Sequence, residues 1–391
     1  MTVTAQQLRE QFAAKLPEGG APLSPEWRDA FATVAREAFV PRFFLHKPGG
    51  GMRAVDSGDE DWLSSVYSDL TLVTQLNGDD TAWDTARGNG GVTGSPTSSS
   101  SQPTLMAWML EALDLQPWHH VLEVGTGTGY NAALLAQRLG SDHVTTIDVD
   151  PRVVEVARTR LARAGSTPTV AEADAARGYS GRAPYDRILA TCSWPRIPHA
   201  WLEQARPGGL ILSHLYTELD AGAMPLLRVN SDGTATGHFL GEYGAFMPRR
   251  DYQRPDTLAL LQRALRSDDE PTRSLARMPS GEVTSLDFPL FAALRVPGVA
   301  LHWFQPEDAP AMRTYLLCRD GSCANQELDD GQLVAVQSGP RRLWDEIDAV
   351  YAEWAALGKP TRDRFGLTVT AEAHTLWLDR PTGEHTWTLP P

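Results

Sequence analysis

The sequence predicts an α/β fold in which a parallel sheet with helices is followed by a C-terminal α+β domain. Between residues 119 and 215, short apolar segments alternate with segments of helical periodicity. A turn with three glycines, Gly125, Gly127 and Gly129, joins the first of these strands to the first helix. From about residue 225 the alternation gives way to hairpin patterns with Ser-Asp-Gly and Asp-Gly turns. The first domain is therefore expected to be Rossmann-like.

Composition and charge exclude several classes of protein. Hydrophobic residues make up 42% and charged residues 21% of the 391 positions, as in ordinary globular proteins. There is no apolar run long enough for a membrane span, and the polar N-terminus lacks the apolar core of a secretion signal, so we expect a cytoplasmic protein without a membrane partner. The formal net charge of −14, without a basic run, argues against a nucleic-acid partner. Three cysteines at unrelated spacings indicate neither a disulfide framework nor a metal site.

The expected strands of the first domain alternate with two helices of clear periodicity. The strands are HHVLEV, HVTTIDVD, TPTVAEAD, YDRILATCSW and the segment 210–215. The helices are YNAALLAQRLG, which ends at Gly140, and PRVVEVARTRLARAG, which begins at Pro151 after the N-cap Asp150. Two further helices, AQQLREQFAAKL and SPEWRDAFATVAREAF, precede the domain. In a parallel sheet of this kind, ligands bind beyond the carboxyl ends of the strands.

Acidic residues mark three of these strand ends and indicate the ligand. Glu123 precedes the glycine turn, Asp148 ends the second strand and Asp174 ends the third. The first acid would repel a pyrophosphate, whereas the second is placed for ribose hydroxyls and the third for an adenine amino group. This pattern predicts a site for S-adenosylmethionine and its product S-adenosylhomocysteine, formed by Glu123, Gly125, Thr126, Gly127, Thr128, Gly129, Tyr130, Asp148, Val149, Asp174 and Ala175.

The end of the fourth strand narrows the reaction class. It reads Ala-Thr-Cys-Ser-Trp, without the Asn or Asp, the prolines and the aromatic residue of amino-directed nucleic-acid methyltransferases. Cys192 has no neighbouring base in the sequence and is interpreted as a structural thiol. The G-x-G-x-G spacing disfavours a nicotinamide oxidoreductase. A non-catalytic binding module with the same fold stays as the alternative outside the enzymes.

Between residues 30 and 245 the chain resembles the protein-L-isoaspartate O-methyltransferases. The resemblance is carried by FVPRFF, VYSDLTLVTQ, SSSSQPTLMAWMLEAL, VLEVGTGTGYNAALLA and APYDRILATCSWPRIPHAWLEQARPGGLIL. It implies that Ser101 is the active-site serine, with Ser100 and Gln102 beside it in the candidate catalytic set. Thr104 stands where the family has a histidine, which puts ordinary repair specificity in question. Ser101 is also a possible N-cap for the helix that begins near Pro103, and the two roles are compatible.

The C-terminal segment RFGLTVTAEAHTLWLDRP looks like a long actinobacterial branch of this family, found beside genes for ribosomally made, modified peptides. That resemblance implies methylation of an aspartate in a modified precursor peptide. The ester would close to an aspartimide, which can hydrolyse to isoaspartate. The alternative is a general isoaspartate repair enzyme.

Two parts of the chain depart from the short members of the family. The insertion at 76–97 is rich in Gly, Asp, Ser and Thr, so its composition predicts a mobile loop that serves either as a lid or as a plain surface insertion. We place a domain boundary between residues 1–245 and 246–391. The second domain, whose aromatic residues are read as core, is expected to bind the precursor peptide.

Overall fold

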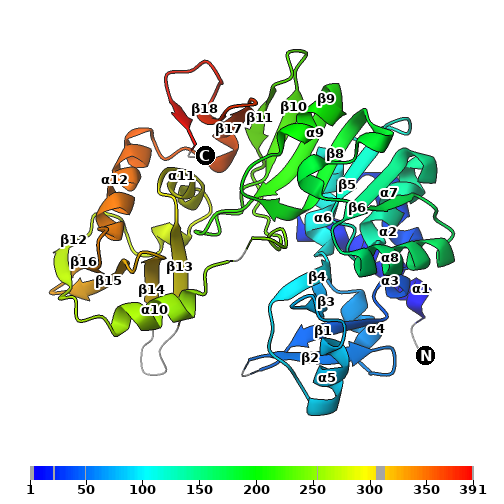
Figure 1. Cartoon of the computed structure of the whole chain (residues 1–391), viewed down its shortest axis with the longest axis horizontal. Coiled ribbons are helices and arrows are strands. Elements are labelled where there is room, and N and C mark those ends of the chain that lie inside the picture. Colours follow the sequence, from blue (N-terminus) through cyan, green and yellow to red (C-terminus); the bar gives the residue numbers. More distant parts are fainter. Residues whose placement is uncertain (1–3, 21–22, 49, 253, 305–312, 390–391) are drawn as a thin grey trace. The chain divides into compact units, whose positions relative to one another are not determined.

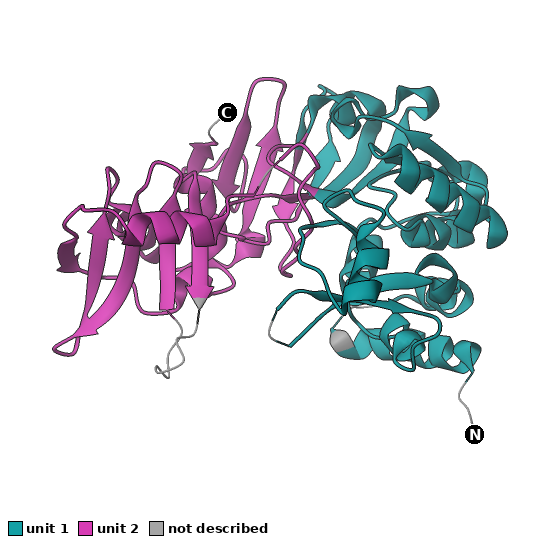
Figure 2. Ribbon diagram, turned by 60° about the horizontal axis from the view of Figure 1, so that its bottom comes forward, with its two compact units in different colours: residues 1–192, 198–213, 226–235 teal, residues 193–197, 214–225, 236–391 magenta. Residues whose placement is uncertain are grey.

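The computed structural model describes residues 4–20, 23–48, 50–252, 254–304 and 313–389, which form two compact units (Figures 1 and 2). Unit 1 comprises residues 1–192, 198–213 and 226–235, and unit 2 comprises residues 193–197, 214–225 and 236–391. The units interleave in sequence because the chain passes from unit 1 to unit 2 after residues 192, 213 and 235. Short 3₁₀ turns punctuate both units: η1 (Leu16–Gly19), η2 (Ser141–His143), η3 (Ala175–Arg177), η4 (Ser180–Arg182), η5 (Glu282–Thr284) and η6 (Arg362–Arg364).

Unit 1 begins with helices that precede a small antiparallel sheet. The helices are α1 (Ala5–Lys15), α2 (Pro25–Thr33) and α3 (Arg36–Phe39). The sheet has the order β2-β1-β3-β4. Its elements are β1 (Arg42–His46), β2 (Met52–Asp56), α4 (Trp62–Val66), β3 (Leu72–Leu76), α5 (Ala82–Asn89) and β4 (Pro96–Ser100). Helices α1 and α2 agree with the helices that the sequence predicts, whereas this sheet was not predicted.

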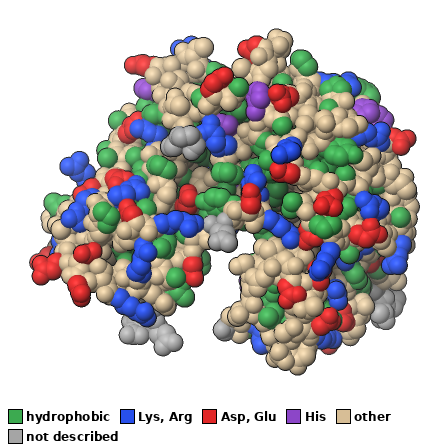
Figure 3. All heavy atoms as spheres, in the orientation of Figure 1, with side chains coloured by type: hydrophobic (Ala, Val, Ile, Leu, Met, Phe, Trp, Pro, Cys, Tyr) green, Lys and Arg blue, Asp and Glu red, His purple; other side chains and the backbone are tan. Residues whose placement is uncertain are grey.

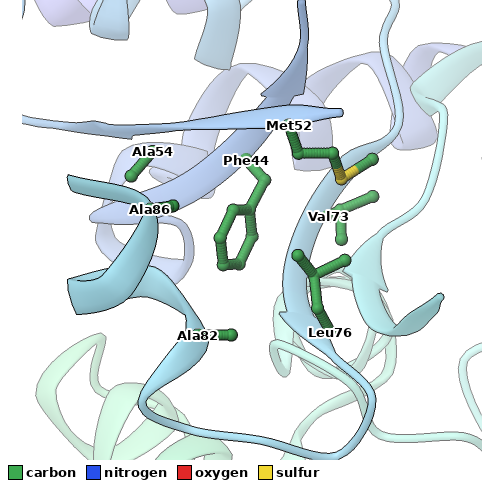
Figure 4. Packing of buried hydrophobic residues seen from close by; sticks show 7 residues of the cluster. All are labelled: Phe44, Met52, Ala54, Val73, Leu76, Ala82 and Ala86. Carbon is green, nitrogen blue, oxygen red and sulfur yellow. The ribbon is translucent and has the colours of Figure 1, made fainter. Parts of the chain in front are cut away.

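The insertion at 76–97 differs from the loop that its composition predicts. Its two ends pair as strands, with Leu76 opposite Pro96, and helix α5 lies between them. In α5, Ala82 and Ala86 pack against the ring of Phe44 in a cluster of buried apolar residues (Figure 4). Two small residues one turn apart let the helix approach the sheet closely. Burial of these apolar groups gives the insertion a defined structure despite its polar composition.

The second part of unit 1 is the doubly wound sheet that the sequence predicts. Its strand order is β10-β9-β8-β5-β6-β7, with β5 parallel to β6 and β8, and β6 parallel to β7. The elements are α6 (Pro103–Ala112), β5 (Val121–Val124), α7 (Tyr130–Leu139), β6 (Val144–Asp148), α8 (Pro151–Arg163), β7 (Thr169–Glu172), β8 (Tyr185–Trp194), α9 (His199–Gln204), β9 (Ala205–Leu215) and β10 (Pro225–Val229). This is the Rossmann-like architecture of class I methyltransferases, and the predicted fold class is confirmed.

Unit 2 is an α+β assembly with two groups of strands. One has the order β11-β17-β18-β19, and the other is an antiparallel sheet with the order β12-β16-β15-β14-β13. The elements are β11 (Ala235–Phe239), α10 (Thr257–Leu265), β12 (Thr272–Leu275), α11 (Phe288–Arg295), β13 (Val299–Phe304), β14 (Arg313–Cys318), β15 (Cys323–Asp329), β16 (Gln332–Ser338), α12 (Leu343–Ala356), β17 (Phe365–Val369), β18 (His374–Leu378) and β19 (Thr386–Thr388). Trp344, Trp354 and Trp377 are buried, in agreement with aromatic residues that form a core.

Candidate functional site

The glycine turn connects β5 to α7 through backbone conformations that favour glycine. Gly125 and Gly127 have φ of 98° and 51°. A Cβ on Gly125 would lie 2.7 Å from Thr191 Oγ1, and a Cβ on Gly127 would lie 3.0 Å from the carbonyl oxygen of Ser99. Both glycines are therefore required by their backbone angle and by a neighbouring oxygen. The second contact places β4, the serine strand, directly against the turn.

The hydroxyl groups and the tyrosine of the turn are directed into the protein. Thr126 Oγ1 lies 2.8 Å from Thr146 Oγ1, and Thr128 Oγ1 accepts a 3.4 Å hydrogen bond from the backbone N–H of Tyr130. Thr128 and Tyr130 are buried, and the guanidinium of Arg36 lies 5.8 Å from the centre of the Tyr130 ring. These side chains pack into the protein beneath the turn, so the backbone of the turn is the part that a ligand could approach.

Glu123 is fully buried at the end of β5. Its Oε1 accepts a 2.7 Å hydrogen bond from the side-chain amide of Asn131, whereas its buried Oε2 has no hydrogen bond within the described residues. Burial raises the pKa of Glu123 to about 7, against the opposing effects of Thr146 and Asn131. Glu123 is thus a buried acid with one oxygen that has no hydrogen-bond partner among the described residues.

Asp150 is the N-cap that the sequence predicts, and Asp148 lies beside the glycine turn. Asp150 caps α8, because its Oδ1 accepts the N–H groups of Arg152 at 2.9 Å and Val153 at 3.4 Å. Asp148 ends β6, and its carboxylate accepts the N–H of Gly127 at 3.2 Å. The carboxylate of Asp148 is thus held beside the glycine turn. The side chain of Val149, between the two acids, is 51% exposed.

The third acid lies beyond its strand rather than at its end, which corrects the predicted boundary. β7 ends at Glu172, and Asp174 caps the η3 turn by accepting the N–H of Ala176 at 2.9 Å. The intervening N–H of Ala173 donates to the carbonyl of Asp148 at 3.0 Å, so the chain still follows the edge of β6. Ala175 begins η3, and its carbonyl accepts the indole N–H of Trp201. The exposed Asp174 therefore stays available to a ligand.

The serine segment passes from β4 into α6. Ser100 is buried and its hydroxyl accepts a 3.3 Å hydrogen bond from Arg36 Nε. Ser101 is half-buried, and its hydroxyl makes no hydrogen bond to any described residue, whereas its carbonyl accepts one from Arg36 Nη2 at 3.2 Å. The hydroxyl group of Ser101 is thus the one of this pair that is open to a substrate.

The expectation that Ser101 caps α6 is wrong. The N-cap position belongs to Gln102, whose side chain makes no capping bond to the helix. Asp69 takes the capping role from a distant loop: its Oδ1 accepts the N–H of Thr104 at 2.8 Å, and its Oδ2 accepts the Gln102 amide at 2.8 Å. A carboxylate from elsewhere satisfies the helix end, so the Ser101 hydroxyl is not needed there.

Four residues of the site region were missed from the sequence. Arg36 and Asp69 hold the serine segment, and the hydroxyl of Thr191 donates to the carbonyl of Gly125 at 2.8 Å. Gln75 Nε2 donates to Asp80 at 3.1 Å and to Asp150 at 3.2 Å, which ties the start of the insertion to α8. Only Thr191, at a strand end beside the turn, carried a positional signal in the sequence.

Within the described ranges there is no cluster of His, Cys, Asp and Glu that could hold a metal ion, and no helix long and apolar enough to span a membrane. On the face drawn in Figure 3, basic and acidic side chains are interspersed over the surface. The region around the strand ends contains a buried acid, Glu123, an exposed acid, Asp174, and an acid held beside the glycine turn, Asp148.

Comparison with known proteins identifies the relatives of this chain. Residues 83–224 match the family model described as protein-L-isoaspartate(D-aspartate) O-methyltransferase. Protein-L-isoaspartate O-methyltransferases from Pyrococcus horikoshii and Hyperthermus butylicus are 38% and 37% identical, over 37% and 41% of this chain and 70% and 72% of theirs. The one from Methanosarcina mazei is 38% identical, but the match spans just over half of its length, 54%.

A solved protein-L-isoaspartate O-methyltransferase has the same fold along nearly the whole chain. The match covers 95% of this chain and 100% of that one, with a TM-score of 0.53 and 21% sequence identity. The likeness therefore extends beyond the residues that the family model matches.

Proposed function

The chain belongs to the protein-L-isoaspartate O-methyltransferase family, and on this basis we propose that it transfers a methyl group from S-adenosylmethionine to a carboxylate of an aspartyl or isoaspartyl residue in a peptide. The observation that carries the proposal is the close approach of the Ser99 carbonyl to Gly127, where a Cβ would lie 3.0 Å from that oxygen. This approach brings the serine strand against the glycine turn that we assign to the cofactor, with Ser101 two residues farther along the chain.

The reaction requires little acid–base catalysis from the protein. A carboxylate is ionised at neutral pH and is itself the nucleophile, so no general base is needed. S-adenosylmethionine, when bound, supplies an electrophilic methyl group on a sulfonium. The residues that would hold it are Glu123, the turn Gly125–Gly129, Asp148 and Asp174. The open hydroxyl of Ser101 would donate a hydrogen bond to one carboxylate oxygen and so direct the other toward the methyl group.

We further propose that the substrate is an aspartate in a ribosomally made, modified precursor peptide. The support is the likeness of the C-terminal segment to the long branch of the family, together with Thr104 in place of the family's histidine. In such a peptide the nitrogen of the following backbone amide attacks the methyl ester. A C–N bond forms, methanol leaves, and an aspartimide results, which can hydrolyse to isoaspartate.

A general repair role is the second candidate, and the names of the relatives favour it. Three substrates separate the two: an unstructured isoaspartyl peptide, its normal aspartyl counterpart, and the precursor peptide encoded beside this gene. Mass spectrometry with S-adenosylmethionine is expected to detect a gain of one methylene on the precursor, followed by loss of methanol. Methylation of the isoaspartyl peptide alone would establish repair and refute maturation.

Binding tests the cofactor assignment independently of the substrate. Calorimetry with S-adenosylhomocysteine should give a one-to-one complex. Absence of binding by a folded sample would refute the methyltransferase proposal as a whole.

A further inference from the structure

Arg36 is a buried cation that connects three segments of unit 1. It begins α3, and its side chain is fully buried. The guanidinium donates to the carbonyls of Val66, Ser68 and Leu70 at 2.9, 3.1 and 3.0 Å. Its remaining bonds reach the serine segment: Nε donates to Ser100 Oγ at 3.3 Å and Nη2 to the carbonyl of Ser101 at 3.2 Å. All five N–H donors of an arginine are thereby used.

The partners of Arg36 are unusual for a buried charge, because all of them are neutral oxygens. Burial lowers the pKa of Arg36 to about 10, with Asp69 and two tyrosines acting in the opposite direction. Arginine stays charged at this pKa, so the group is retained at a cost in desolvation. A neutral residue would fill the same space without that cost, which indicates that the five directed bonds matter.

Asp69 continues the connection from the loop that Arg36 holds. It lies between Ser68 and Leu70, whose carbonyls bind Arg36. Its two carboxylate oxygens accept bonds from the Gln102 amide and the Thr104 backbone N–H, both at 2.8 Å. Arg36 therefore binds residues 100–101 directly. Asp69, which belongs to the loop that Arg36 binds, forms hydrogen bonds with residues 102 and 104. The two sides enclose Ser101, whose hydroxyl stays open.

We propose that Arg36 and Asp69 form a clamp that positions the backbone of Ser101 for methyl transfer. The inference rests on the proposed function, since it assigns these residues to the orientation of the substrate carboxylate. Neither residue is expected to touch the reacting atoms. The clamp acts through the carbonyl of Ser101 and the first turn of α6, so that its loss would misplace the hydroxyl while the sheet stays intact.

Two conservative variants test the clamp. Arg36→Lys keeps the charge but offers three donors in place of a planar fork of five. Asp69→Asn keeps the size of an exposed side chain but places an amide donor opposite Gln102 or Thr104. We expect kcat to fall roughly 10- to 100-fold in each, because small misplacements of a reacting group carry such penalties. The KM for peptide and the Kd for S-adenosylhomocysteine should change by less than about twofold.

Arg187→Lys is the matched control. Arg187 is also buried and donates to backbone carbonyls, those of Asp186 and Asp114 among them, at 2.9 and 3.1 Å. It pairs in register with Val121, the first residue of β5, and so lies at the opposite end of the strand from the glycine turn. The control should lower the unfolding temperature and leave kcat unchanged per binding-competent molecule, counted by the calorimetric stoichiometry.

The outcomes separate the clamp from the function on which it rests. A selective loss of kcat in Arg36→Lys and Asp69→Asn, absent in Arg187→Lys, supports the clamp. Variants that match the wild type, or an arginine variant that behaves like the control, overturn it. A wild-type protein that binds S-adenosylhomocysteine but methylates none of the peptides overturns the proposed function and the clamp together. If Arg36→Lys fails to fold, Asp69→Asn alone decides, because its side chain is exposed.

Discussion

Glu123 should make the stability of the protein depend on pH in an unusual direction for a carboxylate. Burial raises its pKa from 4.5 to about 7 in the folded state. Between these values the folded protein holds a proton that the unfolded chain has released, so the contribution of Glu123 to stability falls as the pH rises. It is fully present below pH 4.5 and lost by about pH 7. The shift corresponds to about 3 kcal/mol at neutral pH.

Glu123→Gln tests this reasoning with little change in shape. The substituted side chain keeps an oxygen for the Asn131 amide but cannot ionise. We expect the unfolding free energy of the variant, relative to that of the wild type, to rise by up to about 3 kcal/mol between pH 5 and pH 8. Urea unfolding of both proteins measures this difference. Glu172→Gln, on an exposed side chain at the end of β7, is the control. A difference between variant and wild type that is constant with pH would refute the argument.

The same group should report on the ligand. A cation bound near Oε2 would favour the carboxylate form and lower the pKa of Glu123, so binding at pH 7 should release about half a proton. Calorimetry with S-adenosylmethionine in two buffers of different ionisation heat measures that number. Equal heats for the wild type, or the same difference in Glu123→Gln, would exclude Glu123 as the group that responds.

Three further perturbations address separate parts of the site. Ser101→Ala should lower kcat roughly 10- to 100-fold, the value of a hydrogen bond to a charged group, with an unchanged melting curve; unaltered kcat and KM would remove Ser101 from the reaction. Gly127→Ala and Gly140→Ala should each cost about 1–2 kcal/mol of stability, because both glycines have positive φ. Only Gly127→Ala should also weaken S-adenosylhomocysteine binding, because its Cβ would lie 3.0 Å from the carbonyl oxygen of Ser99, whereas a Cβ on Gly140 has no atom within 4 Å; equal losses of affinity would contradict this reasoning. Asp150→Ala should cost about 1 kcal/mol of stability because a helix cap is lost, whereas Asp148→Ala should weaken cofactor binding. Calorimetry and urea unfolding of both variants test this assignment, and a loss of binding in Asp150→Ala with a loss of stability in Asp148→Ala would contradict it.

The parts of the fold that were predicted from sequence are those with strong local patterns. The strands β5, β6, β8 and β9 were anticipated because apolar residues run between glycine, proline and aspartate signals. Asp150 before Pro151 correctly predicted a capped helix, since a cap is a property of three consecutive residues. β7 was expected to run to Asp174, but the aspartate forms its own turn, and a side chain that caps a turn ends the strand early.

What could not be predicted depends on contacts between distant segments. Arg36 and Ser101 are joined across 65 positions, and no local pattern distinguishes this arginine from a solvated one. The same holds for Asp69, which caps a helix that begins more than thirty residues later. The helical periodicity in the sequence of α5 is weak, and its polar, glycine-rich surroundings are typical of a loop. The helix is stabilised by packing on Phe44, which the sequence places far upstream.

The pairing of Leu76 with Pro96 holds the two ends of the insertion together at one end of β4. Because these two residues hold the ends of the segment together, its length and sequence can change at a small cost in loop-closure entropy without moving Ser100 at the far end of β4. The insertion is therefore a segment whose sequence can be exchanged while its two ends stay in place. Exchange of residues 79–94 among relatives, with Asp80 kept for Gln75 and two small residues kept for Phe44, is expected to leave the serine segment in place.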